Sequence, residues 1–337
     1  MQQTLRSALK QYIINQLWRL ESSRRVFEGN AAILMLHRIA PIDSAKLPIN
    51  EALKVSPEFL QSFITEAKER GYSFVSLDEL AHNLTESKPF SKLLCITIDD
   101  GYKDNLTYGY PIFDTHRVPF CIYVCTSFPE SSHNMWWFGL EDYLLANKGG
   151  GQCTDSAHRQ CTESSELEHL EELFLSLRAQ IIQNSTSYTD SLHICQKLGI
   201  AYNPRTYDAL ALSWEDIAYI AKNPLATIGN HTHTHPIFNR LTPQEISDDI
   251  AQAQRLFKAH NLAPRHFAYP FGGRIEVDSR YFAIPRELDF VSATTTRMGS
   301  IYPTHREFLH ALPRFMLTDT FALRHIYRPR RQRVVVS

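Results

Sequence analysis

Short apolar runs of strand length alternate with amphipathic helical segments along most of the chain. The runs at Ala31–Leu36, Leu93–Ile98 and 119–124 are apolar throughout, which is typical of strands covered on both faces in a parallel sheet. Helical segments stand between them, one from Ser56 to Gly71 and one over about 104–116. This strand–helix–strand order predicts an α/β fold with a parallel sheet.

The alternation resumes near residue 205. Ser213 is placed to cap one helix, and Thr242 with Glu245 forms a capping-box pattern that opens another. The further strands are expected at 73–76, 226–228, 266–269, 290–294 and 312–315, and the further helices at 77–84, 213–221 and 242–260.

Residues 131–205 interrupt this order. They contain the pair Trp136 and Trp137, three glycines at 149–151 and a charged helical stretch from about 163 to 182. We interpret them as an insertion that forms a small helical cap. The tryptophan pair either stacks on sugar rings or anchors the cap as core residues, and the sequence leaves both open.

The first residues form a separate helical segment. Positions 4–20 place leucines and Ile13 on one face and basic residues elsewhere, so the segment within 1–26 either docks on the domain over 27–337 or makes peripheral contact with an anionic membrane. No run approaches the roughly 20 apolar residues that span a bilayer, and the start does not resemble a secretory signal.

Composition narrows the class of protein. Hydrophobic residues make up 43% of 337, enough for a sizeable core, and the formal net charge of -1 gives no basis for a nucleic-acid partner. The six cysteines include no Cys-x-x-Cys pair, so we expect reduced thiols. We therefore expect a cytoplasmic protein, with the inner face of the membrane as the alternative location.

Polar or glycine-rich residues follow several of the predicted strands. His37, the pair Asp99 and Asp100, the segment 231–235 (His-Thr-His-Thr-His) and the segment 270–273 all stand at strand ends. Because the carboxyl ends of parallel strands gather at one edge, these segments are expected to converge on one site.

The side chains in these segments suit hydrolysis. Neighbouring aspartates on extended backbone point apart, so one can bind a cation while the other accepts a proton, although Asp-Gly is also a common turn. The histidines of 231–235 can share a metal on a helical turn or line one face of a strand, and the sequence leaves both open. One aspartate with two histidines suits a catalytic divalent ion, zinc first and cobalt or nickel as alternatives, that activates water towards an amide or ester.

Three segments resemble the motifs of the polysaccharide deacetylases, which are also called carbohydrate esterase family 4 or the NodB homology family. Residues 97–101 (Thr-Ile-Asp-Asp-Gly) resemble the first motif, 229–236 the second and 269–272 (Tyr-Pro-Phe-Gly) the third, and the strand at 33–38 is similar to the family's first strand. The resemblance covers most of the chain outside 1–26 and 131–205. It implies an irregular (β/α)7-like barrel, here with an inserted helical cap.

The resemblance also implies roles. Asp99 would be the catalytic base, and Asp100, His231 and His235 would bind the metal. Thr232 would support the site through hydrogen bonds. The oxyanion and substrate side would comprise the backbone N–H of Phe271 together with Tyr269, Pro270 and Arg314.

Two departures from the family pattern concern the proton transfers. The arginine that holds the catalytic aspartate is missing from the third motif, which reads Phe-Ala-Tyr-Pro over 267–270, and 312–314 (Leu-Pro-Arg) stands where Leu-x-His is usual. The general acid is therefore His310, His37 or a water on the metal.

These observations predict a hydrolase that removes an N-acyl group, acetyl first, from an amino sugar. The substrate would be a glycan or a glycan precursor for surface polysaccharide, including a lipid-linked sugar. The alternatives are a metal amidase for a small non-sugar amide and an inactive glycan-binding protein. The intact set Asp99, Asp100, His231 and His235 argues against the last.

Overall fold

The structure is a computed structural model that describes residues 29–147, 163–187 and 190–326. The amphipathic helix expected at 4–20 and the arginine-rich end of the chain lie outside the described residues. Among the described helices, none combines the length and the apolar character that crossing a membrane requires.

One parallel sheet forms the centre of the fold. Its strands are β1 (Ala31–Leu36), β4 (Ser73–Phe74), β5 (Leu93–Ile98), β6 (Phe120–Val124), β7 (Ala226–Asn230), β8 (His266–Ala268), β9 (Ser292–Thr294) and β10 (Phe315–Met316). The order is β10-β1-β5-β6-β7-β8-β9, with β4 beside the start of β5, and each pairing is parallel. The short strands β2 (Arg38–Ile39) and β3 (Lys54–Val55) pair separately.

The two edges of the sheet are joined by one short stretch of chain. Leu312 exchanges hydrogen bonds with β9, while Phe315 pairs with Leu34 of β1. The sheet therefore curls into the irregular barrel that the family resemblance implied. The chain from Leu312 to Phe315 forms the seam of the barrel, so the side chains within it lie between the two edges of the sheet.

Helices follow the strands as expected. They are α3 (Pro48–Glu51), α4 (Pro57–Glu69), α5 (Leu77–Thr85), α6 (Tyr110–His116), α7 (Trp136–Ala146), α8 (Glu163–Asn184), α9 (Ser191–Lys197), α10 (Trp214–Ile220), α11 (Pro243–Ala259) and α12 (Ala283–Glu287). Shorter turns are π-helical at Asn105–Gly109 and 3-10 at Pro204–Leu210, Phe238–Arg240, Ser279–Tyr281, Pro303–Glu307, Leu309–Ala311 and Leu323–His325. The predicted caps are present, because Ser213 and Thr242 each form a capping box.

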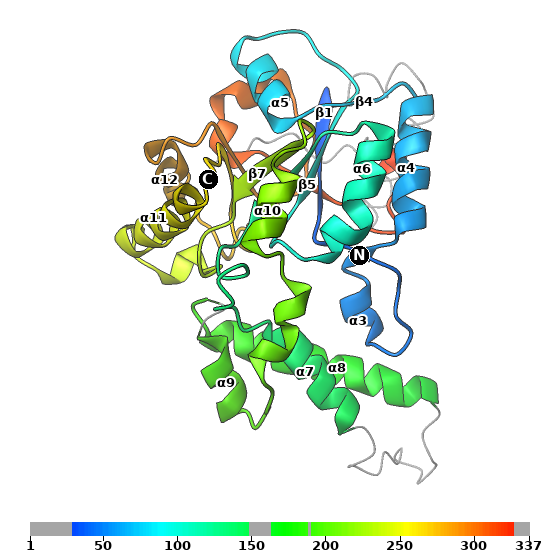
Figure 1. The fold of residues 1–337 in the computed structure, drawn as a ribbon, viewed down its shortest axis with the longest axis vertical. Coiled ribbons are helices and arrows are strands. Elements are labelled where there is room, and N and C mark those ends of the chain that lie inside the picture. The colour runs from blue at the N-terminus through cyan, green and yellow to red at the C-terminus, as the bar shows by residue number, and fades with distance from the viewer. Residues whose placement is uncertain (1–28, 148–162, 188–189, 327–337) are drawn as a thin grey trace, which may run out of the picture.

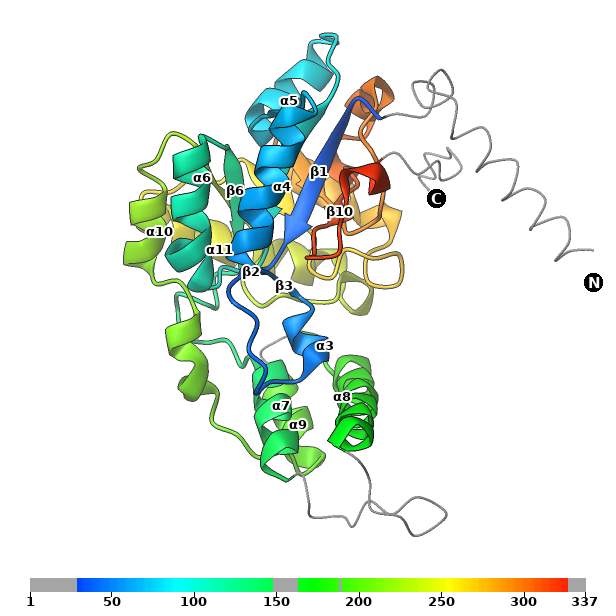
Figure 2. The ribbon, with the colours of Figure 1, turned by 90° about the vertical axis from the view of Figure 1, so that its right-hand side faces the viewer.

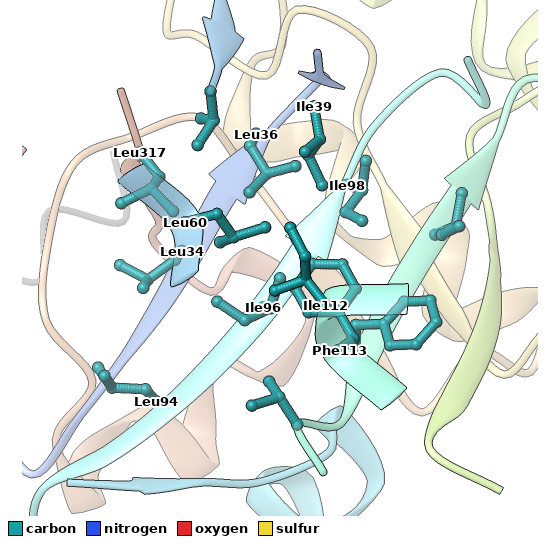
Figure 3. Packing of buried hydrophobic residues seen from close by; sticks show 14 of the residues in the cluster. Leu34, Leu36, Ile39, Leu60, Leu94, Ile96, Ile98, Ile112, Phe113 and Leu317 are labelled. Atoms are coloured by element: carbon teal, nitrogen blue, oxygen red, sulfur yellow. The ribbon is translucent and has the colours of Figure 1, made fainter. Parts of the chain in front are cut away.

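The main core lies between the sheet and the helices on its outer face. Leu34, Ile96 and Ile98 from the strands pack with Leu60 of α4 and Phe113 of α6, as Figure 3 shows, and all five are buried. The opposite faces of the same strands fill the barrel interior in a second cluster. Both faces of β1 and β5 are thus covered, which explains their uninterrupted apolar sequence.

The described residues of the insertion at 131–205 form the helices α7, α8 and α9. They share an apolar core to which α7 contributes Phe138 and Leu140 and α8 contributes Phe174 and Ile181. The three helices lie together below the sheet in Figure 1. In Figure 2 the arrow of β1 points towards them. The insertion therefore covers the edge where the carboxyl ends of the strands meet.

We predict that Gly229→Ala destabilises the barrel by about 1–3 kcal/mol through overpacking. A methyl group on Gly229 of β7 would lie 2.3 Å from the ring of Tyr123, which is buried on β6 and has no room to move. Urea denaturation measures the loss. The double variant with Tyr123→Leu should be less destabilised than the sum of the two single variants. Additive losses would show that this contact does not limit the position.

Candidate metal centre and cleft

A cleft of about 370 Å³ opens between the carboxyl edge of the barrel and the cap. The strand-end segments predicted to converge do meet here. The barrel contributes His37, Asp99, Asp100, His231, His235 and Phe271, and the cap contributes Trp136, Trp137, Phe138, Arg178 and Ile182. Residues more than 200 positions apart, such as His37 and Phe271, therefore share one cavity of the size that small-molecule sites usually have.

Asp100, His231 and His235 form a buried cluster that suits a divalent cation. Oδ1 of Asp100 lies 3.5 Å from Nε2 of each histidine, and the three ligand atoms lie within 4.8 Å of one another. Oδ1 of Asp100 is buried without a hydrogen-bond donor among the described residues. A buried carboxylate oxygen without a donor is costly unless a cation binds it.

The protonation of the three groups agrees with this fit. Burial lowers the pKa of His231 to about 4 and that of His235 well below its usual value, so both imidazoles are neutral at pH 7 and can act as ligands. Burial and the adjacent charge of Asp99 raise the pKa of Asp100 well above its usual range. A bound cation would favour the ionised form of Asp100 and remove that cost.

The segment 231–235 is a turn, and neither of the two conformations that the sequence left open. It leaves β7 at Asn230, and Thr232 and His235 both adopt left-handed backbone with φ of 70° and 53°. Nδ1 of His231 lies 2.8 Å from the carbonyl oxygen of Ala268, which directs Nε2 towards Asp100. Thr232 supports the turn, because its Oγ1 accepts the backbone N–H of His235 at 3.1 Å.

Asp249 of α11 holds this turn from outside the cluster. Its Oδ1 accepts the backbone N–H of His233 at 2.7 Å, and its two oxygens share the N–H and the hydroxyl of Thr234. The ring of His233 is paired with the hydroxyl of Thr126 and does not line the cleft. The strained turn between His231 and His235 is thus held from outside by a carboxylate that sequence reasoning missed.

Asp99 is held by Arg314, which crosses the seam of the barrel. Nη1 and Nη2 of Arg314 donate to the two carboxylate oxygens of Asp99 at 2.7 Å each, and its Nε donates to Thr295 O at 2.9 Å. Both side chains of the pair are almost fully buried. Burial raises the pKa of Asp99, but the charge and the hydrogen bonds of Arg314 outweigh it and the pKa lies below the usual value.

This placement corrects the role expected for Arg314. The sequence assigned it to the oxyanion and substrate side, whereas its guanidinium is committed to Asp99. It therefore pairs with Asp99 as the resemblance led us to expect of the arginine missing from the segment 267–270. An arginine in the otherwise apolar stretch around residue 314 was the available signal, because a buried guanidinium needs an internal partner.

His37 and His310, the two histidines considered as acids, lie in different environments. His37 lines the cleft at the end of β1, and its Nδ1 has no hydrogen-bond partner among the described residues. Its pKa is lowered, mainly by burial. His310 does not line the cleft, and its Nε2 is 2.7 Å from the carbonyl oxygen of Phe290. His310 is therefore not placed to give a proton to a substrate in the cleft.

Of the segment 269–271, Phe271 lines the cleft. Its backbone is left-handed with φ of 57°, and its ring packs edge-on against His235 at 4.7 Å. Tyr269 is fully buried and its hydroxyl donates to the carbonyl oxygen of His310 at 2.9 Å, and Pro270 is also buried. Tyr269 and Pro270 therefore shape the turn behind the cleft and do not contact its contents.

The cap side of the cleft is mainly aromatic. Trp136 is 4% exposed and packs in the cap core, whereas Trp137 is half-buried and lines the cleft, where stacking on a sugar ring stays a prediction. Arg38 lies over the ring of Phe138 and donates to Asp104 at 2.7 Å. These contacts attach α7 to the end of the first barrel strand.

Comparison with known proteins agrees with this geometry. A family model described as polysaccharide deacetylase matches residues 86–290. The deacetylase PplD of Streptococcus pyogenes, solved with acetate, aligns at a TM-score of 0.59 and 17% identity, over 90% of this chain and 100% of that one. IcaB from Ammonifex degensii aligns at 0.54 and 18%, over 86% and 92%. A search of curated protein sequences gave no match.

We predict that Asp249→Asn weakens zinc binding about tenfold, because losing the carboxylate loosens the turn between His231 and His235, and outer-shell partners of metal ligands typically matter by that factor. Zinc affinity, measured by competition with a chromophoric chelator, tests this. The neighbouring Asp248→Asn is the matched control, since Asp248 is exposed and bonds only Gln244 among the described residues. Equal affinities in the two variants would contradict the role of Asp249.

Proposed function

The chain belongs to the polysaccharide deacetylase family, and on that premise we propose that it is a metal-dependent hydrolase that removes an N-acetyl group from an amino sugar. The observation that carries the proposal is the juxtaposition in one cleft of two differently held carboxylates. Asp99 is ion-paired with Arg314, and the adjacent Asp100 faces His231 and His235. One group can take a proton while the other binds a cation.

The residues divide the reaction between them. Asp100, His231 and His235 would hold the ion, most suitably zinc, which supplies Lewis acidity at the amide carbonyl when bound. Asp99, kept ionised by Arg314, accepts the proton of the attacking water.

Two further groups complete the mechanism that we propose. The backbone N–H of Phe271, on its left-handed turn, donates to the oxygen that gains charge as the amide carbon becomes tetrahedral. His37 is the acid that gives a proton to the departing amine, because it lines the cleft and its buried Nδ1 is not engaged by a described residue. Burial lowers the pKa of His37 and the nearby charge of Asp99 opposes this shift, so His37 has to take up a proton before it can give one.

The shape of the cleft supports a sugar derivative with an apolar portion. Aromatic side chains form its cap wall, and Leu53 and Met298 line it while remaining 46% and 52% exposed. A lipid-linked precursor of a surface polysaccharide would cover these two side chains. In this proposal the enzyme acts in the cytoplasm at the inner face of the membrane, where residues 4–20 provide peripheral contact.

Release of acetate from N-acetylated sugars tests the function, with two variants that fail for different reasons. Asp99→Asn should retain about one zinc ion per chain and lose activity by at least about a hundredfold, the usual size of a general-base contribution. His235→Ala should lose both zinc and activity. Metal analysis and acetate assay on the same samples separate the two. Full activity in Asp99→Asn, or activity without metal, would refute the proposed mechanism.

The Asp99–Arg314 pair predicts a shift in the pH profile. The carboxylate of Asp99 works only when ionised, so activity falls as the pH drops through its lowered pKa. In Arg314→Lys a single ammonium group replaces the two parallel N–H donors of the guanidinium, so the pKa of Asp99 rises and the acid limb of kcat/KM moves to higher pH. The control is Arg286→Lys, an exposed position on α12. Zinc content at each pH separates this shift from metal loss, and an unmoved limb would contradict the prediction.

A further inference from the structure

Arg178 of α8 is a cation at the cleft that has no ionic partner among the described residues. It is an exposed residue of the inserted cap and lines the cleft. The two other arginines that line the cleft are each held by a carboxylate at 2.7 Å, Arg314 by Asp99 and Arg38 by Asp104. The guanidinium of Arg178 therefore keeps its donors available for a molecule in the cleft.

The cleft has a surplus of positive charge once a divalent ion is counted. Three arginines and two aspartates line it. Asp99 neutralises Arg314 and Asp104 neutralises Arg38, which leaves Arg178 and Asp100. A divalent ion on Asp100 would add more positive charge than that carboxylate removes. A neutral acetylated sugar has no group that complements this surplus, whereas an anionic one does.

The surroundings of Arg178 indicate where that anion would lie. Ile182, one turn later on α8, also lines the cleft, so this face of the helix looks into it. The cation comes from the cap, and the cluster of Asp100 and the two histidines comes from the barrel. A substrate that bridges the cleft would place its acyl group at the barrel side and its anionic group at α8.

We infer that Arg178 binds an anionic group, a phosphate or a carboxylate, that the substrate carries beside the acylated sugar. The inference rests on the proposed function and adds its substrate class, an acidic derivative of an N-acyl amino sugar. A guanidinium suits this task, because its planar fork matches both anions with two parallel hydrogen bonds. Arg178 is then a specificity residue that the inserted cap adds to the barrel.

Binding to the zinc-free full chain tests the inference without turnover. Two of the four tryptophans, Trp136 and Trp137, line the cleft, so their fluorescence reports occupancy. The probes are N-acetylhexosamine 1-phosphates and the matching neutral methyl glycosides. Removal of zinc prevents the phosphate from binding at the metal. Wild-type protein should bind the phosphates about tenfold more tightly than the glycosides, a difference of about 1.4 kcal/mol.

The preference should disappear in Arg178→Gln and be partly retained in Arg178→Lys. Arg286→Gln, which removes an exposed charge from α12, is the matched control and should keep it. If Arg178→Gln still prefers the phosphates over the neutral glycosides, the inference is overturned. It is also overturned if the wild type prefers neither phosphate nor carboxylate probes over neutral ones. Disaccharides that pair an N-acetylhexosamine with a uronic acid test whether the anionic group is a carboxylate. A preference for either the phosphate or the carboxylate probes supports the inference.

Acetate release by the zinc-loaded protein distinguishes failure of the Arg178 inference from failure of the proposed function. If Arg178→Gln raises KM for the anionic probe about tenfold and leaves kcat and the neutral probe unchanged, Arg178 acts in substrate binding. If the neutral probe is hydrolysed with the same kcat/KM as the anionic probe, the Arg178 inference fails and the proposed function stands. If no probe is bound or hydrolysed, the proposed function fails and the inference falls with it.

Discussion

The ion pair between Asp99 and Arg314 is the interaction on which the organisation of this site depends. Two charged side chains almost without exposure are stable in a barrel interior only when each satisfies the other, and here both guanidinium prongs meet both carboxylate oxygens at 2.7 Å. The pair also joins the two edges of the sheet, because Arg314 lies in the seam between β9 and β1. The same residue, Arg314, therefore lies where the barrel closes and keeps the Asp99 carboxylate ionised.

Backbone strain is concentrated around the same cleft. Asp100, Thr232, His235 and Phe271 all have left-handed backbone, which is unfavourable for residues other than glycine and costs about 1–3 kcal/mol at each. The surrounding structure holds these turns, as Asp249 does for the segment 231–235. Such turns direct side chains from several strand ends towards one point, which regular strands or helices would not do.

The inserted cap gives the cleft its second wall and its own chemistry. The barrel supplies the carboxylates and histidines, and the cap supplies aromatic side chains and Arg178. The segments that resemble the family motifs, 97–101, 229–236 and 269–272, all lie in the barrel and outside the cap. Reaction type is thereby assigned to the barrel, and the choice of substrate is proposed to lie with the cap.

The sequence by itself predicted the α/β fold, most of the strands and the helix caps at Ser213 and Thr242, because periodicity and capping residues are local signals. It also predicted that Asp99, Asp100, His231 and His235 converge at strand ends, and they do line one cleft. It did not determine the partner of Asp99, the support from Asp249 or the distance of His310 from the cleft. These depend on contacts between segments up to 215 positions apart. Such contacts exist only after the sheet closes, since closure alone decides which side chains share the interior and which turn is forced into left-handed backbone.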